Sequence, residues 1–436
     1  MKSHALKMAY DYVLVVSRQP RCRTILLAIW LAAAIGLPGR GADESGGPTK
    51  NVAVLTTVYR HNSHADVIAG RLLLTETLDG RGRRSPLRLA SLYTDQRPAN
   101  DTSRLLSAAL GFPIYSNIAG ALTLGTGRLA VDGVLLIAEH GDYPVSASGN
   151  TQFPKRRFWE ETLKVFRASG RVVPVFVDKH LADNWTDAKY IYDTARELKI
   201  PLLAGSSVPG TWRHPPMDVT RDAELKEIVA LTYHTTDAYG FHALEAVQAL
   251  AEQRRGGETG VRTVRTVRGA DVWQAQAEGR FDGELFRAAC GVLPSPLNLE
   301  QLPQKVREPK LMVVEYRDGL RVSLLELNGA VGNWSAAWRY RKDDKTAATL
   351  FWTQEARPAA HFTRLLHGIE QMMFTGTPPW DVERTLLTSG VLDALLRSER
   401  QGGALLPTPE LDVTYTPRWR WTEPPPPPPS RPWSDQ

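Results

Sequence analysis

From Asn51 to Ser206 the sequence alternates between apolar, β-branched runs and segments whose apolar residues recur at helical spacing. The apolar runs are too continuous for strands with one solvated face, so they indicate parallel strands that are buried on both sides. The intervening helical segments would then cover both faces of the sheet. The alternation predicts a doubly wound, Rossmann-like α/β domain over residues 51–207.

The second half of the chain follows a different pattern. Lys310–Leu327 consists of two strand-like runs around an Arg-Asp-Gly turn, and residues 336–340 and 347–352 form a second pair. Two long helical segments come after these pairs. We therefore expect residues 208–410 to form an α+β domain with an open, largely antiparallel sheet and helices on one side.

Both ends of the chain differ in composition from the two predicted domains. Arginines precede the apolar run Thr24–Leu37, and small residues follow it, which is typical of a secretory signal peptide. We expect residues 1–42 to be a signal peptide or an uncleaved N-terminal anchor, followed by a linker over residues 43–50. The chain would then be exported, as a periplasmic, extracellular or membrane-anchored protein. Residues 411–436 are expected to be a proline-rich tail.

Charge and cysteine content exclude several classes of function. The formal net charge of +6 is spread over many short loops, with no basic stripe and no zinc-finger spacing, so a nucleic-acid partner is not expected. Two cysteines, Cys22 and Cys290, exclude a disulfide framework. A membrane would be contacted only through an uncleaved N-terminal segment. The C-terminal sheet would be the surface through which a homo-oligomer forms.

Three ionisable residues end the fifth predicted strand. The run Val175-Phe-Val is followed directly by Asp178, Lys179 and His180. In an open parallel sheet, ligands bind outside the carboxyl ends of the strands. These three side chains are therefore predicted to lie in the functional site.

This strand end resembles the Glu-Lys-Pro strand end of the Gfo/Idh/MocA family, in which the lysine is catalytic. The segments Ser91–Asp95, Gly111–Tyr115, Asp132–Ala138 and Phe362–Pro379 also occur in the family's order and spacing. The resemblance implies a Rossmann domain, a second domain, and an NAD(P)-dependent oxidoreductase that acts on a small sugar or polyol derivative.

The resemblance also implies roles for individual residues. Lys179 falls on the family's catalytic lysine, while Asp178 and His180 depart from the pattern at its two sides. His242 falls on the histidine that takes part in proton transfer beside the lysine. The aspartate that precedes this histidine in the family is Ala238 here, and Asp237 lies one residue early. One residue is a rotation of about 100° on a helix, so Asp237 is not expected to substitute for it.

The loop after the first strand departs further from the family. Thr56, Val58 and His61 stand where the family has the three glycines that let the backbone approach a pyrophosphate. Asp95 stands where an acidic residue binds the adenosine ribose, although a turn-forming role in Asp95–Pro98 explains it equally well. The resemblance implies that NAD or NADP, tightly bound in an exported enzyme, would contact Thr56, Thr57, Val58, His61, Asp95 and Glu139. The residues themselves argue against ordinary binding.

Histidine and carboxylate side chains follow three of the predicted strands and would converge at one edge of the sheet. Such a cluster is suited to a divalent metal or to an acid–base network. An alternative to the dehydrogenase is therefore a hydrolase, lyase or isomerase that works without a dinucleotide, with or without a metal. The residues that would hold the metal are His61, His64, His140, Asp142 and His180. A second alternative is a non-catalytic carbohydrate-binding descendant of the fold.

Overall fold

The structure is a computed structural model that describes residues 48–426, except residues 79, 81, 343–344 and 355–356. The predicted signal peptide or anchor lies outside the described residues, as does the end of the polyproline run. Within the described ranges, no helix has both the length and the apolar composition needed to cross a membrane.

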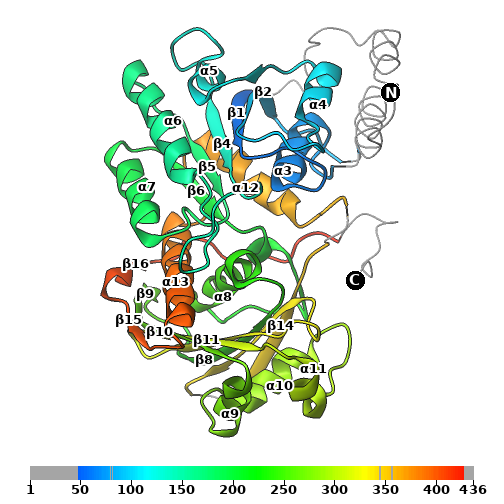
Figure 1. Cartoon of the computed structure of the whole chain (residues 1–436), viewed down its shortest axis with the longest axis vertical. Helices are drawn as coiled ribbons and strands as arrows, with labels where there is room; N and C mark the ends of the chain where they lie inside the picture. The colour runs from blue at the N-terminus through cyan, green and yellow to red at the C-terminus, as the bar shows by residue number, and fades with distance from the viewer. Residues whose placement is uncertain (1–47, 79, 81, 343–344, 355–356, 427–436) are drawn as a thin grey trace.

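The first domain is built on a six-stranded parallel sheet in the order β3-β2-β1-β4-β5-β6 (Figure 1). Its strands are β1 (Lys50–Thr56), β2 (Leu87–Thr94), β3 (Ile114–Tyr115), β4 (Gly133–Ile137), β5 (Val175–Asp178) and β6 (Leu202–Gly205). The connecting helices are α3 (His64–Leu73), α4 (Ser103–Leu110), α5 (Ile118–Thr123), α6 (Lys155–Ser169) and α7 (Trp185–Glu197). Ala53 and Leu55 of β1 pack with α5, α6 and α7, while Val52 and Val54 pack with α3 and α4. Both faces of the sheet are thus covered, which confirms the doubly wound prediction.

The second domain contains an eight-stranded sheet in the order β15-β10-β11-β12-β8-β13-β14-β7. Its strands are β7 (Trp212–His214), β8 (Leu225–Thr232), β10 (Val261–Arg268), β11 (Lys310–Tyr316), β12 (Arg321–Glu326), β13 (Trp334–Tyr340), β14 (Thr346–Trp352) and β15 (Leu406–Pro407). All neighbours are antiparallel except the parallel pair β8–β12, so the predicted open, largely antiparallel sheet is confirmed.

The expectation that helices cover one side of this sheet is wrong. Ile228 and Ala230 of β8 pack with α8 (Phe241–Ala251) and α13 (Val382–Arg400). Val229 and Leu231, which point to the other face, pack with α9 (Ala270–Ala277), α10 (Gly283–Gly291) and α11 (Leu302–Lys305). Alternate residues of a strand face opposite sides, so an all-apolar strand such as β8 requires cover on both.

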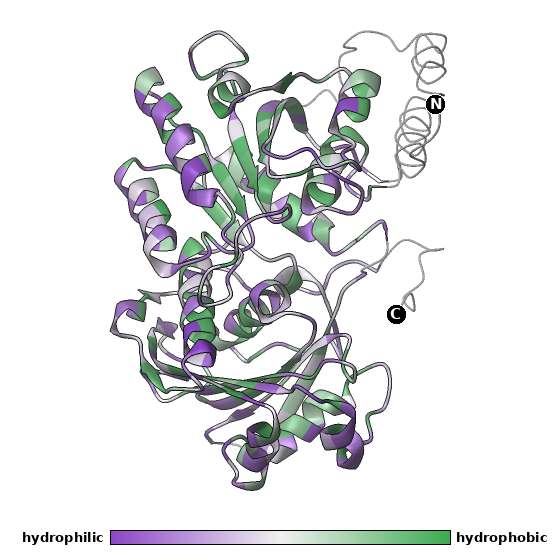
Figure 2. Ribbon diagram, viewed as in Figure 1, coloured by the Kyte–Doolittle hydropathy of each residue, from purple (hydrophilic) through white to green (hydrophobic). Residues whose placement is uncertain are grey.

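Two helices and the last described segment connect the domains. Helix α12 (Phe362–Thr375) packs on the first sheet, beside α3, although the sequence places it in the second domain. Helix α13 contacts α7 and β6 of the first domain and α8 and β10 of the second (Figure 1). The predicted tail from residue 411 includes β16 (Thr414–Tyr415), which pairs with β9 (Glu258–Thr259). Apolar residues concentrate in the parallel strands and polar residues on the outer helices (Figure 2).

Candidate active site

The turn after β5 sends three successive side chains to three different partners. Lys179 has a φ of 59°, which is uncommon for a residue with a side chain, and its N–H donates to the carbonyl of Gly205 at 3.2 Å. A left-handed residue of this kind costs about 1–3 kcal/mol, and such residues cluster at functional sites. Because of this turn, Asp178 contacts His64, Lys179 contacts Glu139, and His180 contacts Lys155.

Glu139 carries the negative charge of the centre and is shared by two lysines. Its Oε2 lies 3.3 Å from the Lys179 ammonium, and its Oε1 accepts from Lys155, whose side chain is completely buried. Lys155 also donates to the carbonyls of Asp178 at 2.9 Å and His180 at 2.7 Å. Burial lowers the pKa of Lys155, against the opposing charge of Glu139. Two lysine side chains thus share one glutamate carboxylate beside β5.

Asp178 and His64 form a proton-sharing pair next to these lysines. His64 Nδ1 lies 2.6 Å from Asp178 Oδ2. Burial raises the pKa of Asp178 to about 7, even though Lys179 and Lys155 favour its charged form. Burial and the charge of Lys179 lower the pKa of His64 to about 3. The pair therefore gains or loses its proton on Asp178 near neutral pH, which suits acid–base work.

Further histidines surround this pair, and they are neutral at physiological pH. The ring centroids of His140 and His242 lie 5.2 Å and 6.3 Å from that of His64. His242 Nδ1 also lies 2.6 Å from the hydroxyl oxygen of Ser206, at the end of β6. Burial and then the charge of Lys179 lower the pKa of His242 well below its ordinary value, and burial does the same for His140. Neutral imidazoles can accept protons as well as donate hydrogen bonds.

A cavity of about 250 Å³ opens beside Lys179 and Glu139, between the two domains. Thr151 and Asp237 also line it. Asp237 Oδ2 accepts from the N–H and hydroxyl of Thr151 at 3.0 and 2.8 Å. Its Oδ1 is buried and has no hydrogen-bond partner in the described ranges of the chain. Burial, only partly offset by these bonds, raises the pKa of Asp237. An unpaired buried acceptor in a polar cavity indicates a place for a ligand hydroxyl.

The groove in which a Rossmann domain holds a dinucleotide is closed between β1 and β2. After β1 the backbone stays hydrogen-bonded to the loop that follows β2. Gln96 N–H donates to Thr57 O at 2.8 Å, and Thr102 N–H donates to Tyr59 O at 2.9 Å. Val58 is 3% exposed and Thr56 donates its hydroxyl to Ile137 O at 2.8 Å. The chain itself fills the space that the glycines leave open in dinucleotide-binding loops.

The ribose position is closed as well. The carboxylate of Asp95 accepts from the hydroxyls of Tyr93 at 2.6 Å and Tyr143 at 2.7 Å, and from Arg157 at 2.5 Å. Burial opposes ionisation of Asp95, but these three donors outweigh it and lower its pKa. The amide of Gln96 forms two hydrogen bonds with the backbone of Asp142, at 2.8 and 2.9 Å, which join the loops after β2 and β4.

The N-terminus of α3, where a pyrophosphate would bind, already holds a carboxylate. Asp66 is fully buried, accepts from the N–H of Asn62 at 2.9 Å, and pairs with Arg357 at 2.7 Å. A carboxylate there satisfies the helix dipole in place of a ligand anion. The residues present therefore do not fit NAD or NADP at the position that the resemblance implies. Glu139, also predicted to contact the cofactor, is held by the lysines instead.

The predicted metal site is not formed. Among the described residues, no group of three or more histidine, cysteine, aspartate or glutamate side chains is arranged to hold a metal ion. The physical reason is that the predicted ligands have other partners. His64 is paired with Asp178, and the backbone N–H of Asp142 donates to Gln96. His180 Nδ1 faces the ammonium of Lys155 at 3.0 Å. A buried ammonium beside a ligand nitrogen repels a cation.

The structure brings together Asp178, Lys179, His180, Glu139 and His242, all of which the sequence singles out. It adds Lys155 and Ser206, which sequence reasoning missed. Lys155 begins a helix in the run Lys-Arg-Arg, which is typical of a solvated surface, so nothing in the sequence marks it as buried. Ser206 directly follows β6, and the rule that ligands bind at strand ends would have found it.

No protein-family profile matches this sequence, and no curated protein matches it. Solved structures do match. GenD2 from gentamicin A biosynthesis, solved in complex with NAD, is 13% identical over 85% of this chain and 99% of its own, with a TM-score of 0.52. The apo scyllo-inositol dehydrogenase of Lactobacillus casei is 9% identical over 82% of this chain and 98% of its own, with a TM-score of 0.51. Myo-inositol 2-dehydrogenase of Lactobacillus plantarum is 8% identical over 82% of this chain and 99% of its own, also with a TM-score of 0.51.

Proposed function

The fold is the two-domain fold of the Gfo/Idh/MocA-type dehydrogenases, and on that frame we propose an enzyme that works by acid–base chemistry without a dinucleotide. Its substrate would be a small sugar or polyol derivative, and its reaction that of a lyase or isomerase. The observation that carries the proposal is the cavity lined by Lys179, whose neighbour Asp178 belongs to a proton-sharing pair, while the dinucleotide groove is closed.

The cavity supports a small, polyhydroxylated substrate. At about 250 Å³ it lies just below the usual size range of ligand pockets, which begins at about 300 Å³. Its wall offers the ammonium of Lys179 and the unpaired Oδ1 of Asp237, which suit an electron-rich oxygen and a hydroxyl group respectively.

In the proposed mechanism each charged group has a separate task. Lys179 stabilises negative charge that develops on a substrate oxygen, and Glu139 holds its ammonium in place. The Asp178–His64 pair, which lies next to Lys179 but does not line the cavity, is the final acceptor of the proton that the substrate loses, and Asp178 is the group that titrates near pH 7. His242, held by Ser206, is the second proton-transfer group.

The experiment is proton–deuterium exchange followed by NMR in D₂O, with a panel of hexoses, uronic acids and inositols. We expect one member to exchange or convert at a carbon-bound proton without a change in absorbance at 340 nm, and its rate to rise with pH through about 7. Lys179→Met should lower this rate at least about a hundredfold. Lys189→Met, which removes an exposed lysine paired with Asp193, is the matched control and should leave it unchanged.

A second candidate is an NAD(P)-dependent dehydrogenase, which the likeness to the NAD complex of GenD2 favours. Reduction of added NAD or NADP in the same panel would support it and contradict the acid–base proposal. A panel in which no member exchanges, converts or reduces a dinucleotide would instead favour a carbohydrate-binding protein. We also propose export, on the support of the apolar segment Thr24–Leu37.

A further inference from the structure

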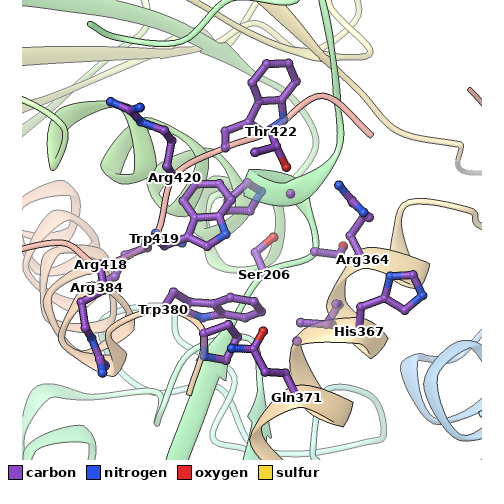
Figure 3. A pocket seen from close by; sticks show the side chains of 17 residues that line it. Ser206, Arg364, His367, Gln371, Trp380, Arg384, Arg418, Trp419, Arg420 and Thr422 are labelled. Atoms are coloured by element: carbon purple, nitrogen blue, oxygen red, sulfur yellow. The ribbon is translucent and has the colours of Figure 1, made fainter. Parts of the chain in front are cut away.

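A second cavity, of about 330 Å³, lies apart from Lys179, where the end of β6, helix α12, the start of α13 and the last described segment meet. Tryptophans and arginines dominate its wall, and none of the described residues that line it is acidic. Figure 3 shows Trp419 and Trp380 on one side of the cavity and Arg364 and His367, both from α12, on the other.

The aromatic side of this cavity is held in place by polar bonds. The indole N–H of Trp380 donates to Ala204 O at 2.8 Å, and its ring leaves no room for a side chain at Gly368, where an added Cβ would lie 2.5 Å away. The guanidinium of Arg384 lies 4.7 Å from the centre of the Trp419 ring. Fixed aromatic rings of this kind bind other rings at a low cost in conformational entropy.

The charges of two arginines at the wall are already balanced, whereas Arg364 forms no ion pair within the part of the chain that the structure describes. Arg384 pairs with Glu252, and Arg418 pairs with Asp381 at 2.7 Å. Arg364 is half-buried, and burial lowers its pKa, with no carboxylate of the described residues acting against it. A guanidinium removed from water without a counter-ion favours an anion from outside.

Ser207 supplies an independent observation. Its side chain is 4% exposed and lines the same cavity, yet its hydroxyl oxygen is buried and has no hydrogen-bond partner among the described residues. A buried hydroxyl left without a partner costs free energy that a bound acceptor would recover. Ser206, the preceding residue, also lines the cavity and bonds His242, which links this cavity to the histidines near Lys179.

We propose that this cavity binds a small organic anion that carries a ring. The phosphate or carboxylate pairs with Arg364 and accepts from Ser207, and the ring stacks against Trp419 and Trp380. The binding site is separate from the cavity beside Lys179 and does not depend on the reaction proposed there.

Isothermal titration of the whole protein tests this assignment with D-glucose 6-phosphate, D-glucuronate, AMP and inorganic phosphate as probes. At least one ring-bearing probe should bind, and Arg364→Gln should weaken it at least tenfold. Trp419→Ala should weaken the ring-bearing probe and leave inorganic phosphate unaffected. Arg128→Gln, a change at an exposed arginine elsewhere, is the matched control and should have no effect.

Lys179→Met should bind the same probe with unchanged affinity, which separates this cavity from the proposed active site. The assignment is wrong if no ring-bearing probe binds, if Arg364→Gln binds as the wild type does, or if inorganic phosphate binds as tightly as the ring-bearing probes.

Discussion

Replacing Glu139 by glutamine is expected to lower the free energy of unfolding by about 3–5 kcal/mol. Glu139 neutralises Lys155, which has no exposed surface, and it also contacts Lys179. Without the carboxylate, the Lys155 ammonium stays buried and keeps hydrogen bonds only to carbonyls and His180 among the described residues. Urea unfolding followed by circular dichroism measures the change.

A double-mutant cycle shows that the loss arises from the charge pair. Lys155→Met should also destabilise the protein, because it leaves the carbonyls of Asp178 and His180 without their donor. The double variant should lose less than the sum of the single losses, by about 1–3 kcal/mol. Strict additivity of the two changes would mean that the pair does not stabilise the centre.

Replacing Gly205 by alanine is expected to destabilise the protein by roughly 2–6 kcal/mol, the sum of backbone strain and overpacking. Gly205 has a φ of 126°, and an added Cβ would lie 2.6 Å from Glu245 Oε2 and 2.9 Å from Thr385 Oγ1. Glu245 is buried and accepts from the N–H of Ser206 and the hydroxyl of Thr388, so it cannot move without losing these bonds.

Gly111→Ala is the matched control for this change. Gly111 also has a positive φ, of 77°, but no atom lies within 4 Å of an added Cβ, so only backbone strain of about 1–2 kcal/mol is expected. Equal losses in the two variants, measured by urea unfolding, would show that the contact with Glu245 does not matter. A larger loss of unfolding free energy for Gly205→Ala would confirm that this glycine lets β6 pack closely against α8 and α13.

The fold could be predicted because its signal is repeated along the chain. Most strands of the first domain are largely apolar runs, and strands β1 to β5 are each followed by an α-helix. The second domain was predicted less fully. Helices α9 and α11 are short, and α12 packs on the first sheet for reasons of tertiary contact that periodicity does not contain.

The candidate site was predictable where it follows strand ends. Asp178, Lys179 and Glu139 were found because parallel strands bring their carboxyl ends to one edge. The sequence predicts the closing of the dinucleotide groove only in part. The missing glycines are visible in the sequence. The hydrogen bonds of Gln96 to Asp142, however, join segments that lie far apart in sequence, and the burial of Asp66 depends on tertiary packing. No local pattern reports such pairings.

The closed groove is the central claim, and dinucleotide binding tests it most directly. The purified full-length protein is denatured to release any bound nucleotide for chromatography, and the native protein is titrated with NAD and NADP in a calorimeter. The bonds that hold Asp95, Gln96 and Asp66 predict no stoichiometric nucleotide and no saturable binding at millimolar concentration. One equivalent of released dinucleotide, or a rise in melting temperature on adding it, would contradict the account.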